Sequence, residues 1–348
     1  MRITESVKRL EAYTPGEQPK SRQVVKLNTN ENPYPPSPAC AKVLASFNLD
    51  NLRRYPDPEC VALRQALAKL NHTTIDHIFV GNGSDEILAL AAKTFVENDE
   101  IIASLNPSYS LYRTLAAIRD VKWVGAKPYA TEVAAADLPP KTALFLWTNP
   151  NAPTGVFAPI ESIAKFARSF KGVVLVDEAY ADFARTNAMG LATAPKNRNL
   201  LVMRTFSKSY SLAGLRVGYC VGPTDLIAAL YKVKDSYNVD ALAQAVALAA
   251  VKDRAYFRQT VRKVVQTRQA LVKALAQRGW DILPSESNFV FARPPKNNAA
   301  ALFAALRSKH IFVRYFPGPY TGDRLRITVG TDDETAKLLR ALDELAKL

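Results

Sequence analysis

The chain has 348 residues, of which 48% are hydrophobic and 22% charged, a composition typical of a globular protein with a large core rather than of a disordered chain. Its 46 lysines and arginines outnumber the 32 acidic residues, so anions are expected partners. The basic residues are scattered without a zinc-finger, KH or RRM signature, and no segment approaches the roughly 20 apolar residues of a membrane span, which argues against nucleic acid and membrane as partners.

The three cysteines, Cys40, Cys60 and Cys220, are widely spaced and form no CxxC pair, and no histidine lies at metal-ligand spacing. We therefore expect reduced structural thiols and no metal site. The start of the chain, MRITESVKRL, lacks the apolar segment of a signal peptide. Together these features predict a cytoplasmic protein.

In chain order, the proline-rich segment 27–39 comes first, and it is expected to form an arm or a site-lining loop because its prolines disfavour a helix. Apolar β-type runs then alternate with helical patterns; the runs are HIFVGNG, EIIASLN, TALFLWTNPN, GVVLVDEAY, NLLVMRTFSK and GYCVGP. This alternation predicts an α/β fold with a mostly parallel sheet and helices on both faces. Ligands of such sheets bind outside the carboxyl ends of the strands, so site residues are expected there.

From about residue 240 the pattern changes to two long helical segments, followed by short strands near 288–294, 311–316 and 324–330 with helices between and after them. This α+β pattern predicts a second, smaller domain. We expect an N-terminal arm over 1–30 that joins the small domain, a large domain over 31–240 and a small domain over 241–348.

The first predicted strand ends in the turn VGNGSDE, which contains Ser84 and Asp85. Gly81 and Gly83 permit a tight turn, and the first amides of the following helix can hold an anion. The turn matches neither the dinucleotide GxGxxG pattern nor a P-loop. Because Asp85 and Glu86 would repel a phosphate, backbone amides and Ser84 are expected to bind it, with both acidic side chains turned away.

Two further strand ends carry aromatic and acidic side chains. Tyr109 follows the second strand, where it either stacks on a flat ligand or covers the core. Asp177 ends the strand VVLVD, with Tyr180 close behind it. A carboxylate buried alone costs on the order of several kcal/mol, so a cation is expected beside Asp177. That cation is either Lys208 or Arg216 in a structural ion pair, or the protonated nitrogen of a cofactor.

Lys208 follows the strand that begins near Leu200, within TFSKSYSLAGLRVGY. Burial there lowers the pKa of a lysine and leaves it nucleophilic. Ser207, Ser209 and Arg216 surround it with groups suited to a phosphate. An imine-forming lysine, an aspartate for a pyridinium, a stacking tyrosine and an anion site together indicate pyridoxal 5'-phosphate as cofactor.

In these motifs, and in LNTNENPY, RRYPDP, NPNAPTG, FVRYFPGP and RLRITVG, the chain resembles the fold-type I pyridoxal-phosphate-dependent aminotransferases, most closely the histidinol-phosphate aminotransferase branch. The resemblance implies a large domain with a mostly parallel sheet between helices and a smaller α+β domain. It implies that Lys208 forms the Schiff base and shuttles the proton, that Asp177 holds the pyridine nitrogen, that Tyr109 stacks on the ring and that Tyr180 binds the 3-oxygen. The phosphate would be held by Ser84, by Asp85 through its amide, by Ser207 and by Arg216.

The resemblance also implies a homodimer, because Tyr55 of RRYPDP would reach the phosphate bound in the partner subunit. Arg326 would bind the substrate's α-carboxylate or, in the histidinol-phosphate branch, its phosphate. Tyr13 and either Asn28 or Asn30 match segments on the substrate side. In one departure, Ala152 stands where family members commonly have an asparagine for the cofactor's 3-oxygen; either Asn149 or Asn151 compensates, or Tyr180 alone serves.

The implied activity is amino transfer between a phosphorylated amino alcohol, histidinol phosphate, and the glutamate/2-oxoglutarate pair, a step of histidine biosynthesis. An aromatic amino acid aminotransferase and a threonine-phosphate decarboxylase remain alternatives on the same fold. A non-enzymatic regulator that binds the cofactor or DNA is disfavoured, because no helix-turn-helix module is appended and the cofactor positions other than Ala152 are filled.

Overall fold

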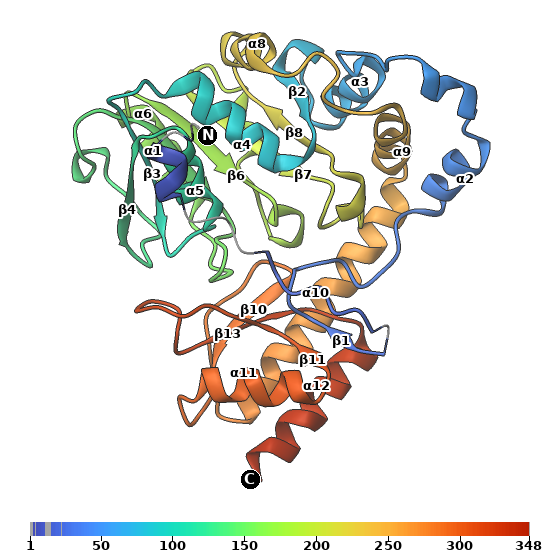
Figure 1. Cartoon of the computed structure of the whole chain (residues 1–348), viewed down its shortest axis with the longest axis vertical. Helices are drawn as coiled ribbons and strands as arrows, with labels where there is room; N and C mark the ends of the chain where they lie inside the picture. The colour runs from blue at the N-terminus through green and yellow to red at the C-terminus, as the bar shows by residue number, and fades with distance from the viewer. Residues whose placement is uncertain (1–2, 4, 11–14, 22, 348) are drawn as a thin grey trace.

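A seven-stranded sheet and a four-stranded sheet form the two parts of the molecule, and the long helix α10 (Arg254–Gln277) runs from one to the other (Figure 1). The computed structural model describes residues 3, 5–10, 15–21 and 23–347. Among these residues no helix is long and apolar enough to cross a membrane, and no cluster of side chains suits a metal ion. The three cysteines are buried and free, as expected.

The large sheet has the strand order β2-β8-β7-β6-β5-β3-β4. Its strands are β2 (Ile78–Gly81), β3 (Ile101–Asn106), β4 (Lys122–Pro128), β5 (Thr142–Thr148), β6 (Val173–Asp177), β7 (Leu200–Thr205) and β8 (Gly218–Val221). Strand β8 is antiparallel to both neighbours, whereas β7, β6, β5, β3 and β4 pair in parallel. The prediction of a mostly parallel sheet is confirmed; the edge strand β4 was not predicted.

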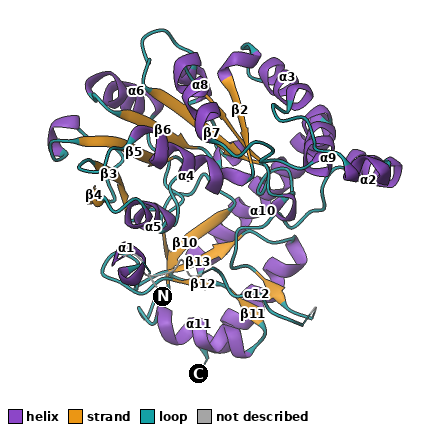
Figure 2. Cartoon of the chain, turned by 45° about the horizontal axis from the view of Figure 1, so that its top comes forward, coloured by secondary structure: helices purple, strands orange, loops and turns teal. Residues whose placement is uncertain are grey.

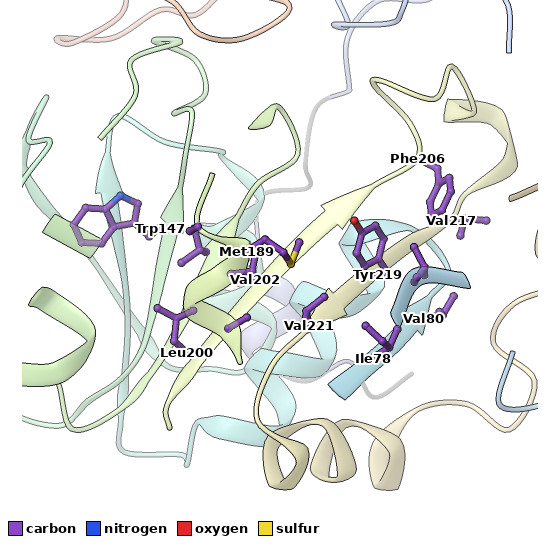
Figure 3. Close-up of a cluster of buried hydrophobic side chains, with 14 of the residues drawn as sticks. Ile78, Val80, Trp147, Met189, Leu200, Val202, Phe206, Val217, Tyr219 and Val221 are labelled. Atoms are coloured by element: carbon purple, nitrogen blue, oxygen red, sulfur yellow. The ribbon is translucent and has the colours of Figure 1, made fainter. Parts of the chain in front are cut away.

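Alternate residues of these strands enter two separate hydrophobic clusters, one on each face of the sheet. Figure 3 shows part of the first cluster, in which Tyr219 and Val221 of β8 lie between Ile78 and Val80 of β2 on one side and Val202 of β7 on the other. This face is covered by α2 (Pro38–Ser46), α3 (Val61–Leu70), α6 (Ile160–Ser169), α7 (Met189–Ala192) and α9 (Ala241–Lys252). The other face is covered by α4 (Gly83–Phe95), α5 (Leu111–Ile118) and α8 (Thr224–Val233), so helices flank the sheet on both sides (Figure 2).

The smaller part contains an antiparallel sheet in the order β12-β13-β10-β9. Its strands are β9 (Asp281–Ile282), β10 (Phe289–Arg293), β12 (Arg314–Tyr315) and β13 (Leu325–Thr328), packed with α11 (Ala299–Ser308) and α12 (Asp332–Ala346). From the N-terminal segment, β1 (Val25–Lys26) pairs in parallel with β11 (Ile311–Phe312). The short helix α1 (Glu5–Arg9) instead lies against α5 of the large part.

Short 3-10 helices complete the chain: η1 (Leu49–Arg53), η2 (Ile75–His77), η3 (Ala135–Asp137), η4 (Ala181–Phe183) and η5 (Ala213–Leu215). Helix η5 lies in the connection between β7 and β8 and ends at Arg216. Helix η4 follows β6 and contacts α10. Two of these helices therefore lie in loops that leave the carboxyl ends of the parallel strands.

The division between the two parts falls inside α10 rather than at residue 241. Helix α9 packs against α2 and α3, and its buried residues Val246 and Val251 belong to the core of the large sheet, as does Phe257 in the first turns of α10. Leu271 and Leu275, farther along α10, belong to the core of the small sheet. The change to a helical pattern near 240 marked a change of secondary structure, not of hydrophobic core.

Candidate active site

A cavity of about 470 Å³ lies at the carboxyl ends of the parallel strands and extends to the small sheet. Its walls come from the ends of β3, β5, β6 and β7, from the start of α4, from residues 28–31 and from β12 and β13. The volume is in the range of small-molecule sites. The position at the strand ends is the one predicted from the alternating pattern.

Lys208 lies in this cavity just beyond β7 and is half-buried. Its Nζ donates to the carbonyl oxygen of Thr29 at 3.2 Å and lies 5.8 Å from the ring centroid of Tyr180. Burial, and next the positive charge of Arg326, lower the pKa of Lys208 to about 8. Part of this amine is therefore uncharged near neutral pH, which suits a nucleophile and a base; the catalytic role of Lys208 stays a prediction.

Asp177 is the last residue of β6 and is 4% exposed. It accepts hydrogen bonds from the Tyr112 hydroxyl at 2.8 Å and from the Ala179 amide at 3.0 Å. Burial nevertheless raises the pKa of Asp177 to about 6. Within the described part of the chain it forms no ion pair, so the structural pairing with Lys208 or Arg216 is not found. Its carboxylate remains available to a cation inside the cavity.

Tyr112 was not predicted from the sequence as a site residue; it lies in the first turn of α5, three residues after Tyr109. Its hydroxyl is fully buried and lies 2.6 Å from the Thr148 hydroxyl as well as 2.8 Å from Asp177. Because its one hydrogen goes to the Asp177 carboxylate, Thr148 donates to Tyr112. The register of β5 with β6 also holds Thr148 next to Asp177, since these two residues are paired across the strands.

The start of α4, where an anion site is predicted, has the geometry that such a site needs. Gly83 has a left-handed φ of 79°, and a Cβ added there would lie 2.7 Å from Nη2 of Arg216. Arg216 is itself left-handed, with φ 54°, and its Nη1 lies 3.3 Å from the Ser207 hydroxyl. The Ser84 amide faces Gly218, where a Cβ would approach within 2.7 Å. Two glycines thus leave room for a guanidinium and helix amides to surround a phosphate.

The two acidic residues of this turn behave differently. Glu86 turns away as expected, accepting from the Asn238 side chain at 2.8 Å and from the Asn82 amide. Asp85 does not: its carboxylate lies 3.3 Å from Arg216 Nη2 and accepts from the Tyr109 hydroxyl at 3.4 Å. The expectation that both side chains turn away is therefore wrong for Asp85, because Arg216 attracts it toward the site. Phosphate binding by its amide stays a prediction.

Tyr109 and Tyr180 both line the cavity. Tyr109 packs edge-to-face on Tyr112 with centroids 5.7 Å apart, and its stacking on a ligand stays a prediction. Tyr180 packs edge-to-face on Phe289 at 5.1 Å, and its hydroxyl accepts from Asn30 Nδ2 at 3.0 Å. Burial raises the pKa of Tyr180, so its hydroxyl keeps its hydrogen at neutral pH.

Neither asparagine proposed to replace the missing one at Ala152 reaches the cavity. Asn149 is fully buried, and its amide bonds at both ends to the backbone of Ala158, at 3.1 Å and 2.8 Å. Asn151 accepts from the Thr154 hydroxyl at 2.9 Å. Their side chains shape the 149–155 loop, as turn-forming asparagines do. The prediction that Asn149 binds the cofactor is thus corrected, because its side chain is bonded to the backbone of its own loop and does not line the cavity. The residues of this loop that line the cavity are Ala152 and Pro153.

Arg326 and Arg314 form the opposite end of the cavity, on the small sheet. They are paired residues of the antiparallel strands β12 and β13, and both line the cavity. Both guanidinium groups lie over the Phe316 ring, 5.1 Å and 5.2 Å from its centroid, and Arg326 donates to the carbonyl of Asn28 at 2.9 Å. Two neighbouring cations favour an anion between them. Arg326 was predicted; Arg314 was missed, although it lies in the quoted FVRYF segment.

Three other predicted residues have different outcomes. Asn30 lines the cavity, as expected. Tyr13 lies outside the described residues. Tyr55 is 81% exposed, stacks on Tyr237 with centroids 4.3 Å apart, and does not line this cavity.

A lysine with a lowered pKa, in one cavity with the guanidinium groups of Arg216, Arg314 and Arg326, suits imine chemistry on small anionic molecules. The α/β fold and this site together define a group-transferring enzyme. The sequence matches the family of class I and II aminotransferases over residues 22–342, and the chain belongs to that family.

Curated relatives are similar over nearly the full length. The chain is 43% identical over 341 residues to histidinol-phosphate aminotransferase 2 of Rhizobium meliloti, covering 97% of each protein. It is 42% identical to histidinol-phosphate aminotransferase of Syntrophotalea carbinolica, covering 99% of each. Among solved structures, histidinol-phosphate aminotransferase from Sinorhizobium meliloti, in complex with pyridoxal-5'-phosphate, superposes with a TM-score of 0.90 at 26% identity over 99% of this chain and 98% of that one.

Proposed function

We propose that the protein is a pyridoxal-phosphate-dependent aminotransferase that converts L-histidinol phosphate and 2-oxoglutarate to imidazole-acetol phosphate and L-glutamate, in histidine biosynthesis. The names and full-length similarity of the curated relatives support this substrate pair. The observation that carries the proposal is the arrangement of the cavity. Lys208 lies between one anion site at α4 and a second anion site at Arg314 and Arg326.

The residues of the cavity fit the cofactor. Ser84, Ser207 and Arg216 would hold its phosphate at the start of α4, in the space that Gly83 leaves open. Asp177 would hold its ring nitrogen, because this buried carboxylate has hydrogen bonds but forms no ion pair with any described residue. Tyr109 would cover one face of the ring, and Tyr180 would donate to the ring oxygen. When bound, the cofactor supplies an electron-withdrawing ring that makes a substrate Cα proton acidic.

Lys208 is the base of the proposed reaction. Its Nζ takes the proton from Cα of the amino substrate and, in the other half-reaction, returns a proton to Cα of the incoming keto acid. A pKa near 8 suits both directions, because the amine exists in both protonation states near neutral pH. The positive charge of Arg326 contributes to that pKa, so the substrate anion bound by Arg326 also tunes the base.

Arg314 and Arg326 bind the anionic end of either substrate. Histidinol phosphate presents a phosphate, whereas glutamate presents carboxylates, and a pair of guanidinium groups can hold both kinds of oxyanion. One binding site therefore serves the two halves of a ping-pong reaction. The Phe316 ring beneath both arginines provides an apolar wall beside this charge.

The direct test is steady-state turnover with 2-oxoglutarate as acceptor and histidinol phosphate, phenylalanine or tyrosine as donor. The proposal expects kcat/KM for histidinol phosphate to exceed that for either aromatic amino acid at least tenfold, since those donors lack the phosphate. The Lys208→Ala variant is the control and should lose turnover with every donor. A reversed donor preference would transfer the function to aromatic amino acids.

Threonine-phosphate decarboxylation is the second candidate on this fold, because that chemistry also needs a phosphorylated amine and the same lysine. The L-threonine-O-3-phosphate decarboxylase of Porphyromonas gingivalis has a similar structure, with a TM-score of 0.80, but at 24% identity it supports the fold alone. Carbon dioxide release from threonine phosphate without formation of glutamate would favour this candidate.

We include a homodimer in the proposal. In the segment 44–61, which contains Tyr55, the side chains of Leu44, Leu49, Leu52 and Val61 are exposed, with Leu49 at 73%, and exposed apolar side chains in such number are typical of an interface. Tyr55 would then reach the cofactor phosphate of the partner subunit. The free cysteines agree with a reducing compartment, and we place the enzyme in the cytoplasm.

Mixed dimers test the shared site. Tyr55→Ala and Lys208→Ala subunits should each be weak or inactive alone. Combined in equal amounts and refolded together, they should regain about a quarter of the wild-type activity, because half of the dimers then carry one complete site. A monomer in sedimentation experiments, or no regain on mixing, would remove Tyr55 from the site.

A further inference from the structure

Asn30 holds a buried position between the two parts of the molecule. It is 1% exposed and has a left-handed φ of 54°, a conformation that asparagine tolerates better than most residues. Its backbone N–H donates to the Thr328 hydroxyl of β13 at 3.0 Å, and its carbonyl accepts from the Asn288 side chain at 3.0 Å. The backbone of Asn30 is therefore fixed to the small sheet on both sides of its side chain.

The direction of each hydrogen bond around the Asn30 side chain follows from these contacts. The Thr328 hydroxyl accepts from the Asn30 N–H, so its own hydrogen is free to go to Asn30 Oδ1, 3.0 Å away. This assigns Oδ1 to Thr328 and leaves Nδ2 to face Tyr180, whose hydroxyl oxygen it reaches at 3.0 Å. Because Nδ2 can only donate, the Tyr180 hydroxyl must accept.

The hydrogen of the Tyr180 hydroxyl consequently points away from Asn30. Within the described chain, Asn30 is the one hydrogen-bond partner of that hydroxyl. Tyr180 and Asn30 both line the cavity, whereas Thr328 does not. Ala152 lies in the same hydrophobic cluster as Tyr180 and offers only a methyl group. A ligand oxygen in the cavity is thus the remaining acceptor for this hydrogen.

We propose that Asn30 is a positioning residue, which acts through Tyr180 by forcing its hydroxyl to donate into the cavity, toward the ring oxygen of the bound cofactor. Thr328 acts with it by fixing the orientation of the Asn30 amide. The inference rests on the proposed function for the identity of the cofactor. It assigns the control of the hydrogen bond to the ring oxygen to the N-terminal segment, because no asparagine of the 149–155 loop reaches the cavity.

Neighbouring residues hold the same segment against the other functional groups. The Thr29 carbonyl accepts from Lys208 Nζ at 3.2 Å, and the Asn28 carbonyl accepts from Arg326 Nη2 at 2.9 Å. The Asn32 side chain donates to the backbone carbonyl of Lys208 at 3.1 Å. The segment 28–32 therefore links the small sheet, the lysine and Tyr180, and these contacts hold Asn30 in place.

Two substitutions at Asn30 separate a directing role from a packing role. Asn30→Asp keeps the size and tolerates the left-handed backbone, but its carboxylate accepts the Tyr180 hydrogen and reverses the bond. Asn30→Ala loses the donor, leaves a small cavity and strains the backbone, but it leaves the Tyr180 hydrogen free to enter the cavity. A packing role predicts that alanine is the more harmful change, whereas a directing role predicts that aspartate is.

The measurements are kcat and KM with histidinol phosphate, the dissociation constant of pyridoxal phosphate, and the thermal midpoint of the cofactor-free protein. We expect kcat of Asn30→Asp to fall about tenfold to a hundredfold, as for a reversed hydrogen bond to a charged group, with KM changed much less. Asn30→Ala should retain a higher kcat and tighter cofactor binding than Asn30→Asp, despite the lower thermal midpoint.

Two substitutions at Thr328 test whether its hydroxyl orients the Asn30 amide. Thr328→Val removes the hydroxyl that orients the amide and should lower kcat toward the Asn30→Ala value, whereas Thr328→Ser should restore it. A near-normal kcat for Asn30→Asp together with a lower kcat for Asn30→Ala would overturn the inference. If the wild-type protein binds pyridoxal phosphate but does not turn over histidinol phosphate, the proposed substrate is wrong while the role of Asn30 can still be tested. That test is whether Asn30→Ala binds the cofactor more tightly than Asn30→Asp.

Discussion

The hydroxyl of Tyr112 donates to Oδ2 of Asp177 at 2.8 Å, and both side chains are buried at the end of the central sheet. This contact holds the carboxylate in place without neutralising it. Asp177 thus combines a fixed position with an unfavourable charge, which a positively charged ring nitrogen would relieve. The charges of Asp177, Lys208, Arg216 and Arg204 should each have a measurable effect on stability, reactivity or cofactor binding.

The charge on Asp177 should make the cofactor-free protein lose stability as pH rises. Its folded-state pKa, about 6, lies above the ordinary value of 3.8, so the carboxyl favours folding below pH 3.8 and ceases to do so as pH rises through 6. Between pH 4 and pH 8, the stability of Asp177→Asn relative to wild type should increase by about 2 to 3 kcal/mol. Urea unfolding across this pH range measures the difference, with the exposed Asp137→Asn as control. A constant difference would mean that Asp177 is not perturbed.

Lys208 should react as a neutral amine above about pH 8. Burial and the charge of Arg326 lower its pKa to about 8, so the rate at which Lys208 is trapped by an aldehyde and borohydride should rise between pH 6 and 9 and then level off. Mass spectrometry of the peptide that contains Lys208 measures the rate. Arg326→Met should move the midpoint to higher pH, since it removes a positive charge. A wild-type rate that still increases beyond pH 10 would contradict the assigned environment.

Substitution of Gly83 should weaken cofactor binding selectively. An alanine there has an unfavourable φ of 79°, and its Cβ would lie 2.7 Å from Nη2 of Arg216. We expect the dissociation constant of pyridoxal phosphate to rise at least about tenfold, the effect of one lost charge-assisted hydrogen bond. Gly190→Ala is the matched control, because a Cβ at Gly190 meets nothing within 4 Å. Equal binding by both variants would remove Arg216 from the phosphate site.

The buried ion pairs of Arg204 should stabilise the loops that carry the site. Arg204 binds Glu178 at 2.8 Å and Asp182 at 2.9 Å, and the Glu178 side chain is fully buried. Arg204→Met should lower the free energy of unfolding by about 3 to 5 kcal/mol, because it leaves Glu178 buried without its cation. The double variant Arg204→Met/Glu178→Met should recover part of that loss. Chemical unfolding of the three proteins measures both effects, and an additive double variant would contradict the pairing.

The sequence predicted the parts of the fold and site that depend on local patterns. Continuous apolar runs identified buried strands, and the residues at their ends, Asp177 and Lys208, line one cavity, because parallel strands end at the same edge. The tight turn at Gly83 could also be predicted from the sequence, since its glycines precede an amphipathic helix. Strand β4 lacked such a signal, as an edge strand whose side chains are mostly half-buried or exposed.

The features that were missed depend on contacts between distant segments. Asn149 appeared suited to the cofactor, but its amide satisfies the backbone of Ala158 across its own turn. Arg314 joins Arg326 only through the register of β12 with β13, which sequence spacing does not specify. Asn30 meets Tyr180 across 150 residues of chain, so their hydrogen bond required the structure.

The absorption spectrum of the protein loaded with pyridoxal phosphate tests the central claim most directly. It should be recorded before and after addition of histidinol phosphate, without a keto acid, and then with phenylalanine and with glutamate in separate samples. The account predicts that the visible band disappears at low concentrations of histidinol phosphate and of glutamate, and slowly with phenylalanine. Lys208→Ala lacks the amine that forms the imine, so it should show no such band with the cofactor alone and should not convert the cofactor to its amine form with any donor. A visible band that histidinol phosphate leaves unchanged, while phenylalanine removes it, would contradict the proposed substrate.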